Sequence, residues 1–140
     1  MKKTFLFFFM AFLFSAVLCA HADPFILEPV VKNLDRPWAV AVIGQGEYLF
    51  TLKQGKLLYV NKKKKQRIVY SVGKLAIYNG GQGGLLDLIL APDFKESREI
   101  FVTFSEKRGR GSVTALASTT FRGNPPRMGT WKVHFRANNY

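Results

Sequence analysis

The residues best suited to chemistry lie in one short loop, residues 79–84, whose sequence is NGGQGG. Four glycines surround the single amide side chain of Gln82. Glycine permits positive φ angles and a close approach of the backbone to a bound group. An amide both donates and accepts hydrogen bonds, which suits a polar ligand such as a sugar or a quinone. The alternative is a tight corner made by the glycines with Gln82 in solvent, and the loop alone favours neither.

Other side chains offer little support for catalysis. His134 lies in the strand-like segment 131–136, and we expect it to be structural. Ser112 and Ser118 have no base near them in the sequence, so nucleophilic catalysis is not expected. Asp87 interrupts an apolar segment, where a buried carboxylate costs several kcal/mol unless it is paired. We therefore expect Asp87 to cap neighbouring loop amides rather than to catalyse.

The first 22 residues have the layout of a signal peptide. Lys2 and Lys3 precede the apolar run 4–20, and Ala20-His21-Ala22 matches the pattern of a signal-peptidase site. The alternative is an uncleaved membrane anchor, since the run approaches the roughly 17 residues of a short spanning helix. We expect cleavage, export to the bacterial periplasm or the medium, and no stable membrane association of residues 23–140.

Composition excludes some classes of site. Cys19 is the only cysteine of the chain and belongs to the signal peptide, so disulfides and thiolate metal sites are excluded from residues 23–140. The whole chain has a net charge of +12, which favours screened attraction to anionic surfaces or ligands. Nucleic-acid binding fits poorly with export, so no nucleic-acid partner is expected. Residues 62–65 are four lysines, expected to form a solvated turn, with contact to an anionic surface as the alternative.

The elements that position these residues are strands. Short apolar segments alternate with turn sequences, a pattern typical of an all-β chain, and no helix is expected after residue 22. The expected strands are 38–43, 48–52, 56–60, 67–72, 85–90, 99–105, 112–121 and 131–136.

These eight segments form two similar sets of four. Each set opens with a segment apolar at successive positions, as expected for a strand buried on both faces. The step from Val40 to Leu88 is 48 residues, and four strands in roughly 40–50 residues are typical of a β-propeller blade. The sequence therefore predicts about two four-stranded propeller blades, with an eight-stranded barrel or sandwich as the alternative. Because propellers close with about 4–8 blades, we expect residues 23–140 to be a truncated, partial propeller domain.

The blade order predicts where Gln82 lies. In a propeller the first strand of a blade lines the central channel and the last strand lies at the rim. The loop 73–84 links the last strand of the first set to the first strand of the second, so it must cross from rim to channel. We expect Gln82 at the channel mouth, where propellers commonly bind ligands.

Three segments carry a resemblance to a known family: RPWAVAV (36–42), GQGGLLDLILAPDF (81–94) and REIFVTFSE (98–106). Over residues 30–136 the chain resembles the N-terminal part of the soluble aldose sugar dehydrogenases of the glucose/sorbosone dehydrogenase family. The resemblance implies a six-bladed propeller, usually periplasmic, with pyrroloquinoline quinone (PQQ) beside calcium on its top face. It also implies oxidation of aldose sugars to lactones, with electrons passed to an external acceptor. By motif, the family's cofactor-binding glutamine falls on Gln82.

The sequence departs from the family in two ways. Relatives tend to have Leu-Pro-Asp-Gly where this chain has Ile43-Gly44-Gln45-Gly46, which should alter only a turn. The family's catalytic histidine belongs to a His-Phe-Gly-x-Arg element that this chain lacks, and His134 stands where relatives carry an aliphatic residue. We therefore expect no catalytic residue, no metal ligand and no dehydrogenase turnover in this chain alone. A non-enzymatic, propeller-derived binding or assembly module is the alternative function.

Overall fold

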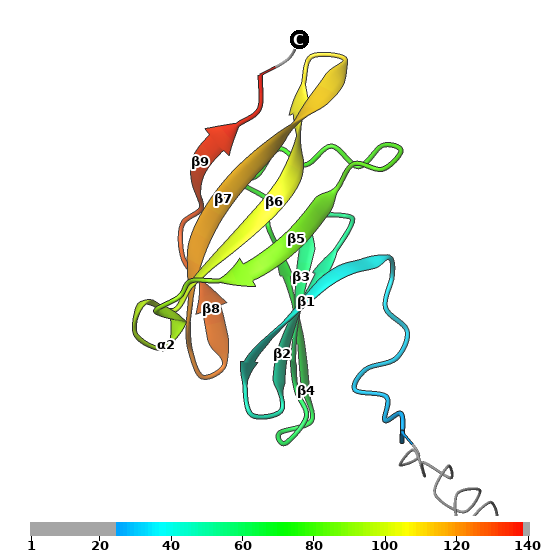
Figure 1. Ribbon diagram of the computed structural model, residues 1–140, viewed down its shortest axis with the longest axis vertical. Helices are drawn as coiled ribbons and strands as arrows, with labels where there is room; N and C mark the ends of the chain where they lie inside the picture. The colour runs from blue at the N-terminus through cyan, green and yellow to red at the C-terminus, as the bar shows by residue number, and fades with distance from the viewer. Residues whose placement is uncertain (1–24, 139–140) are drawn as a thin grey trace, which may run out of the picture.

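The computed structural model describes residues 25–138, which form two antiparallel β-sheets and one short helix (Figure 1). The elements are β1 (Pro37–Gly44), β2 (Glu47–Leu52), β3 (Lys56–Asn61), β4 (Gln66–Ser71), β5 (Leu85–Leu90), α2 (Phe94–Ser97), β6 (Glu99–Arg108), β7 (Gly111–Gly123), β8 (Pro126–Met128) and β9 (Lys132–Arg136). The predicted signal peptide, residues 1–22, lies outside the described residues. Between residues 25 and 138, no helix is long and apolar enough to cross a membrane.

Each sheet is a meander of four main strands. The first has the order β1-β2-β3-β4, and its turns alternate between the two ends of the sheet. In the second, β5, β6 and β7 follow in order, and the 13-residue β7 pairs with β9 along its middle and with β8 at its end. Two such units in succession are two blades of a β-propeller, as predicted.

Two short elements were not predicted. The expectation of no helix after residue 22 is wrong, because α2 forms a single turn of four residues. Buried Phe94 anchors this turn, and Arg98 ends it with a φ of 56° and a backbone N–H that donates to the Phe94 carbonyl oxygen at 2.9 Å. β8 forms because β7 continues beyond its pairing with β9 and turns back through residues 124 and 125.

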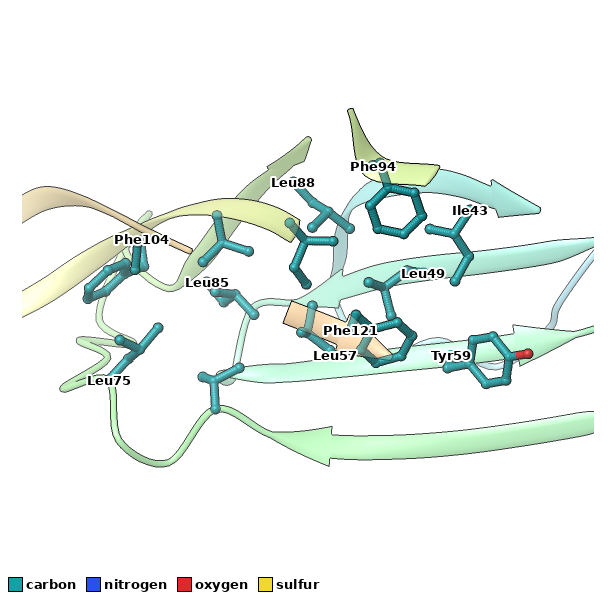
Figure 2. Close-up of a cluster of buried hydrophobic side chains, with 14 of the residues drawn as sticks. Ile43, Leu49, Leu57, Tyr59, Leu75, Leu85, Leu88, Phe94, Phe104 and Phe121 are labelled. Atoms are coloured by element: carbon teal, nitrogen blue, oxygen red, sulfur yellow. The ribbon is translucent and has the colours of Figure 1, made fainter. Parts of the chain in front are cut away.

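A single apolar core joins the two sheets (Figure 2). The buried side chains that meet there from both blades include Leu49, Leu57, Tyr59, Leu85, Leu88, Phe104 and Phe121. The ring of Phe121 lies 5.9 Å from that of Tyr59 and edge-on to that of Tyr70 at 5.4 Å. The end of β7 therefore packs against the two outer strands of the first blade.

A buried threonine connects the blades at their inner strands. The hydroxyl of Thr51, on β2, accepts the Ala39 N–H at 2.9 Å and donates to the Leu86 carbonyl oxygen of β5 at 2.6 Å. In the second blade the Asp87 N–H donates in the same way to the Thr103 hydroxyl at 3.1 Å. Ala39 and Asp87 are 48 residues apart, so these equivalent contacts repeat with the step found in the sequence.

The inner strands are covered on one face only, contrary to the expectation of burial on both. Trp38, Val40 and Val42 of β1 and Ile89 of β5 are between 52% and 63% exposed. Each blade has one neighbouring blade within residues 25–138, so one face of each inner strand packs and the other does not.

Candidate functional site

The loop between the blades, residues 73–84, is fastened to both of them. The Tyr78 N–H donates to the Ser105 carbonyl oxygen at 2.7 Å, which holds the loop along the end of β6. At its other end, the Leu85 N–H donates to the Lys53 carbonyl oxygen at 3.0 Å, in the turn between β2 and β3. The loop thus crosses from β4, at the outer edge of the first blade, to β5, at the inner edge of the second.

Gln82 lies at the tip of a tight turn within this loop. The turn is closed by the Gly83 N–H, which donates to the Gly80 carbonyl oxygen at 2.8 Å. Gly81 has a φ of +50°, in the left-handed region that favours glycine. The Gln82 side chain is exposed, and the Lys53 ammonium donates to the Gly81 carbonyl oxygen next to it. The Lys53 ammonium is therefore bound to the backbone of the turn that carries the Gln82 amide, at the start of the inner strand.

Backbone packing accounts for two further glycines of the loop, Gly83 and Gly84. A Cβ atom on Gly84 would lie 2.6 Å from the Lys53 carbonyl oxygen, and one on Gly83 would lie 2.8 Å from the Tyr78 carbonyl oxygen. Both distances are far below ordinary van der Waals contact, so neither position accepts a side chain without movement of the backbone. The glycines thus make a tight corner, and a ligand role for Gln82 stays a prediction.

A carboxylate held by two arginines lies at the same end of the second blade. Glu106 is 7% exposed, and its oxygens accept hydrogen bonds from Arg136 at 2.7 and 3.0 Å and from Arg108 at 3.0 Å. The hydrogen bonds from Arg136 are the main cause that lowers the pKa of the Glu106 carboxyl below 4.5, against the opposing effect of burial. This cluster connects β6 to β9. No local sequence pattern predicts the cluster, since Arg136 lies 30 residues beyond Glu106 in the chain.

Replacing Glu106 by glutamine is expected to remove an acid-sensitive part of the stability. The pKa of this carboxyl is lower in the folded than in the unfolded chain, so its stabilisation is complete above about pH 4.5 and is lost as the pH falls through the folded-state value. Thermal unfolding between about pH 7 and pH 3 should therefore show a smaller loss in Glu106→Gln than in the wild type. Glu96→Gln, at an exposed carboxylate, is the control, and parallel profiles for wild type and Glu106→Gln would contradict the expectation.

Ser118 has a histidine beside it, which the sequence analysis did not foresee. Its hydroxyl lies 2.6 Å from Glu99 Oε1 and 2.7 Å from His134 Nε2. Because a carboxylate only accepts, the hydroxyl donates to Glu99 and accepts the N–H of His134 Nε2. A nitrogen that already carries a proton toward the serine cannot remove the serine proton, and Ser118 is 1% exposed. The arrangement supports a structural role for His134.

Asp87 is exposed, so the expectation of a buried carboxylate is wrong. It sits on the uncovered face of β5, and its Oδ1 accepts the Leu88 N–H at 2.9 Å. Asp87 does cap a backbone amide, but that amide belongs to β5 rather than to the loop.

No group of three or more histidine, cysteine and acidic side chains in residues 25–138 is arranged to hold a metal ion. An open hollow of about 570 Å³ between the inner strands is lined by residues that include Ile43, Leu90 and Phe94. It lies at the opposite end of these strands from Gln82. In the described part of the chain, Gln82 therefore stands on a surface turn outside this hollow.

Two meander blades, joined by a glycine-bounded loop that carries an exposed amide to the inner strand, define part of a β-propeller protein. The chain belongs to the Glucose / Sorbosone dehydrogenase family, whose sequence pattern matches residues 34–140. This confirms the resemblance seen in the sequence.

Three relatives illustrate the similarity. The aldose sugar dehydrogenase YliI of Escherichia coli K12 is 38% identical over 93 residues, which cover 66% of this chain and 25% of YliI. The crystal structure of the soluble aldose sugar dehydrogenase of Escherichia coli in the apo-form is 33% identical with a TM-score of 0.64, over 74% of this chain and 30% of that one. The PQQ-bound aldose sugar dehydrogenase of Streptomyces coelicolor has a TM-score of 0.70 over 81% of this chain and 34% of that one. At 20% identity, the likeness to that enzyme concerns the fold. The chain spans 25% to 27% of the length of the curated relatives it matches.

Proposed function

We propose that this chain supplies two blades of an exported, PQQ-dependent sugar dehydrogenase that oxidises aldoses to lactones and passes electrons to an external acceptor. Family membership and the similarity to an aldose sugar dehydrogenase support the reaction class. The signal-like sequence of residues 1–22 supports export. The observation that carries the proposal is the exposed amide of Gln82 on the loop that crosses to the inner strand, in a turn whose Gly81 carbonyl oxygen accepts a hydrogen bond from the Lys53 ammonium.

The side chains at this turn suit an anionic quinone. The Gln82 amide can donate to and accept from the polar edge of such a cofactor, and the Lys53 ammonium offsets negative charge on its carboxylates. When bound, PQQ would supply the hydride acceptor for the sugar. Gln82 would hold and orient the cofactor and the sugar at the channel mouth. Calcium finds no ligand cluster among residues 25–138, and no step is assigned to it.

The described residues offer no evident proton acceptor at this turn. Between residues 25 and 138, no histidine or acidic side chain is hydrogen-bonded to the loop 73–84, and His134 bonds to Ser118 instead. Proton abstraction by a positioned base typically contributes 10²–10⁴-fold to a rate, so we propose that this chain alone does not turn over sugar. A dye-reduction assay with PQQ, calcium and an aldose should give no activity, and clear turnover would refute this part of the proposal.

Cofactor binding tests Gln82 directly. In an absorbance titration of the purified chain with PQQ, we expect saturable binding. The Gln82→Ala substitution should weaken the affinity about 2- to 10-fold, because this is the net contribution of a typical hydrogen bond. Gln45→Ala is the matched control, because Gln45 is also an exposed glutamine between two glycines, but in the turn at the opposite end of the first blade. Equal affinity in the wild type and Gln82→Ala would contradict the assignment.

A further inference from the structure

We propose that the end of the molecule opposite Gln82 is a docking surface for the anionic headgroups of a lipid bilayer. This basic rim consists of Lys62–Lys65, in the turn between β3 and β4, and of Arg122 and Arg127, in the β7–β8 hairpin. All six side chains belong to exposed residues. Both turns lie at the lower end of the molecule in Figure 1, while the loop that carries Gln82 begins β5 at the other end.

Hydrogen bonds gather three turns from both blades into this rim. Lys64 Nζ donates to Asn124 Oδ1 at 2.9 Å, which joins the lysine turn to the β7–β8 hairpin. Lys63 Nζ donates to Gln45 Oε1 at 2.7 Å, which brings in the turn between β1 and β2. Within the lysine turn, the Lys64 N–H donates to Asn61 Oδ1 at 2.9 Å. These hydrogen bonds therefore hold the cations of two separate turns along one edge of the molecule.

These hydrogen bonds do not neutralise the positive charge of the rim. The acceptors for two of the lysines are neutral amide oxygens, and only Lys62 pairs with a carboxylate, Glu28, among the described residues. Arg122 and Arg127 are direct partners in the register of β7 and β8. Like charges directly opposite each other in a sheet are destabilising. Anions bound nearby would therefore reduce the repulsion between these two arginines.

Other acidic residues at this end do not cancel the excess. Glu47 accepts hydrogen bonds from the Tyr59 hydroxyl at 2.8 Å and the Asn61 amide at 2.7 Å, and because both donors are neutral it keeps its charge. Glu28 and Glu47 together offset two of the six cations, so the rim keeps an excess of positive charge. In α2, Lys95 and Glu96 are adjacent and offset each other.

A flat anionic surface fits this rim better than a nucleic acid does. The rim residues include no aromatic side chain that could stack on the bases of a single strand, and α2 is too short to fill a major groove. A bilayer needs neither feature, because each Lys or Arg near an anionic membrane raises partition about fivefold by charge alone. The rim also has no large apolar side chain to insert, so the contact is peripheral and reversible and differs from stable anchoring. The Gln82 loop would then face away from the membrane.

Vesicle co-sedimentation of the full chain tests this surface. Binding is measured to phosphatidylcholine vesicles with and without phosphatidylglycerol. The increment is the factor by which the anionic lipid raises the partition of the protein onto the vesicles. The apolar run 4–20 is the same in every variant, so its contribution is common to all of them. Lys63/Lys64/Lys65→Gln is expected to lower the increment on the order of 100-fold, from about fivefold for each charge. About 1 M salt should abolish the increment in the wild type.

The matched control removes three charges from the other end. Lys74/Lys107/Arg110→Gln changes exposed residues in the loop 73–84, near the end of β6 and in the β6–β7 turn, and it should leave the increment nearly unchanged. Arg122/Arg127→Gln is a second test that leaves the lysine turn intact, with an expected loss of about 25-fold. Circular dichroism checks the fold of each variant. Equal losses in the rim and control variants, or no preference for the anionic vesicles, would overturn the proposal. Tighter binding to duplex DNA, with the same lysine dependence, would replace the bilayer by a nucleic acid.

Discussion

Replacing Phe121 by alanine is expected to lower the free energy of unfolding by about 3–5 kcal/mol, the usual cost of removing a buried phenylalanine ring. Phe121 is fully buried and packs against the rings of Tyr59 and Tyr70, so the substitution opens a cavity between the two blades. Small domains are stable by about 5–15 kcal/mol, so this single change consumes a large share of the total. Urea unfolding followed by tyrosine and tryptophan fluorescence measures the difference.

Phe135→Ala is the matched control for this prediction. Phe135 is 57% exposed on β9, and its removal should change the free energy of unfolding by about 0.5 kcal/mol or less. Similar losses at the two positions would mean that the contact between the blades contributes little to stability.

Replacing Gly84 by alanine should be the most damaging change in the interblade loop. Gly84 has a φ of +155°, and a Cβ atom there would lie 2.6 Å from the backbone oxygen of Lys53. Strained backbone costs about 1–3 kcal/mol by itself. The clash adds to this cost, because a backbone oxygen cannot rotate away as the end of a side chain can. The hydrogen bond from the Leu85 N–H to Lys53 should be disturbed as well. A large fall in melting temperature is therefore expected.

Gly81→Ala separates the clash from the strain. Gly81 belongs to the same loop and also has a positive φ, but nothing lies within 4 Å of the Cβ position. Its replacement should cost about 1–2 kcal/mol, from the left-handed conformation only. If Gly81→Ala proved as harmful as Gly84→Ala, the close approach of Lys53 would not be the reason for Gly84.

The strands were predictable because apolar residues and turn residues alternate with strand spacing along the whole chain. β5 was predicted with the bounds that it has, Leu85–Leu90, since this segment, apolar except for Asp87, lies between Gly84 and the turn sequence that begins at Ala91-Pro92. α2 and β8 were missed because four and three residues are too few to display a period. The exposure of Val40 and Ile89 could not be read from an apolar pattern, since coverage depends on the neighbouring blade.

The site was predictable only in outline. The strand order required a crossing loop, and this placed Gln82 at the inner strand. The reason for Gly84 could not be foreseen, because it lies in the backbone of Lys53, in another turn. The contact between Ser118 and His134 depends on an irregularity in the pairing of β7 with β9, between Leu116 and Ala117, which leaves no trace in the apolar pattern.

The hydroxyl of Thr51 makes two hydrogen bonds, one within its own blade and one to the next blade. Among the described residues, the Thr103 hydroxyl makes one hydrogen bond, as an acceptor within its own blade. The first blade thus supplies the threonine of the connection and the second blade supplies the inner-strand carbonyl, while Thr103 occupies in the second blade the place that Thr51 occupies in the first. Tandem copying of one such segment within a gene creates a new junction whose polar contact is already encoded. A ring of this type can therefore grow by one repeat without inventing a new interface.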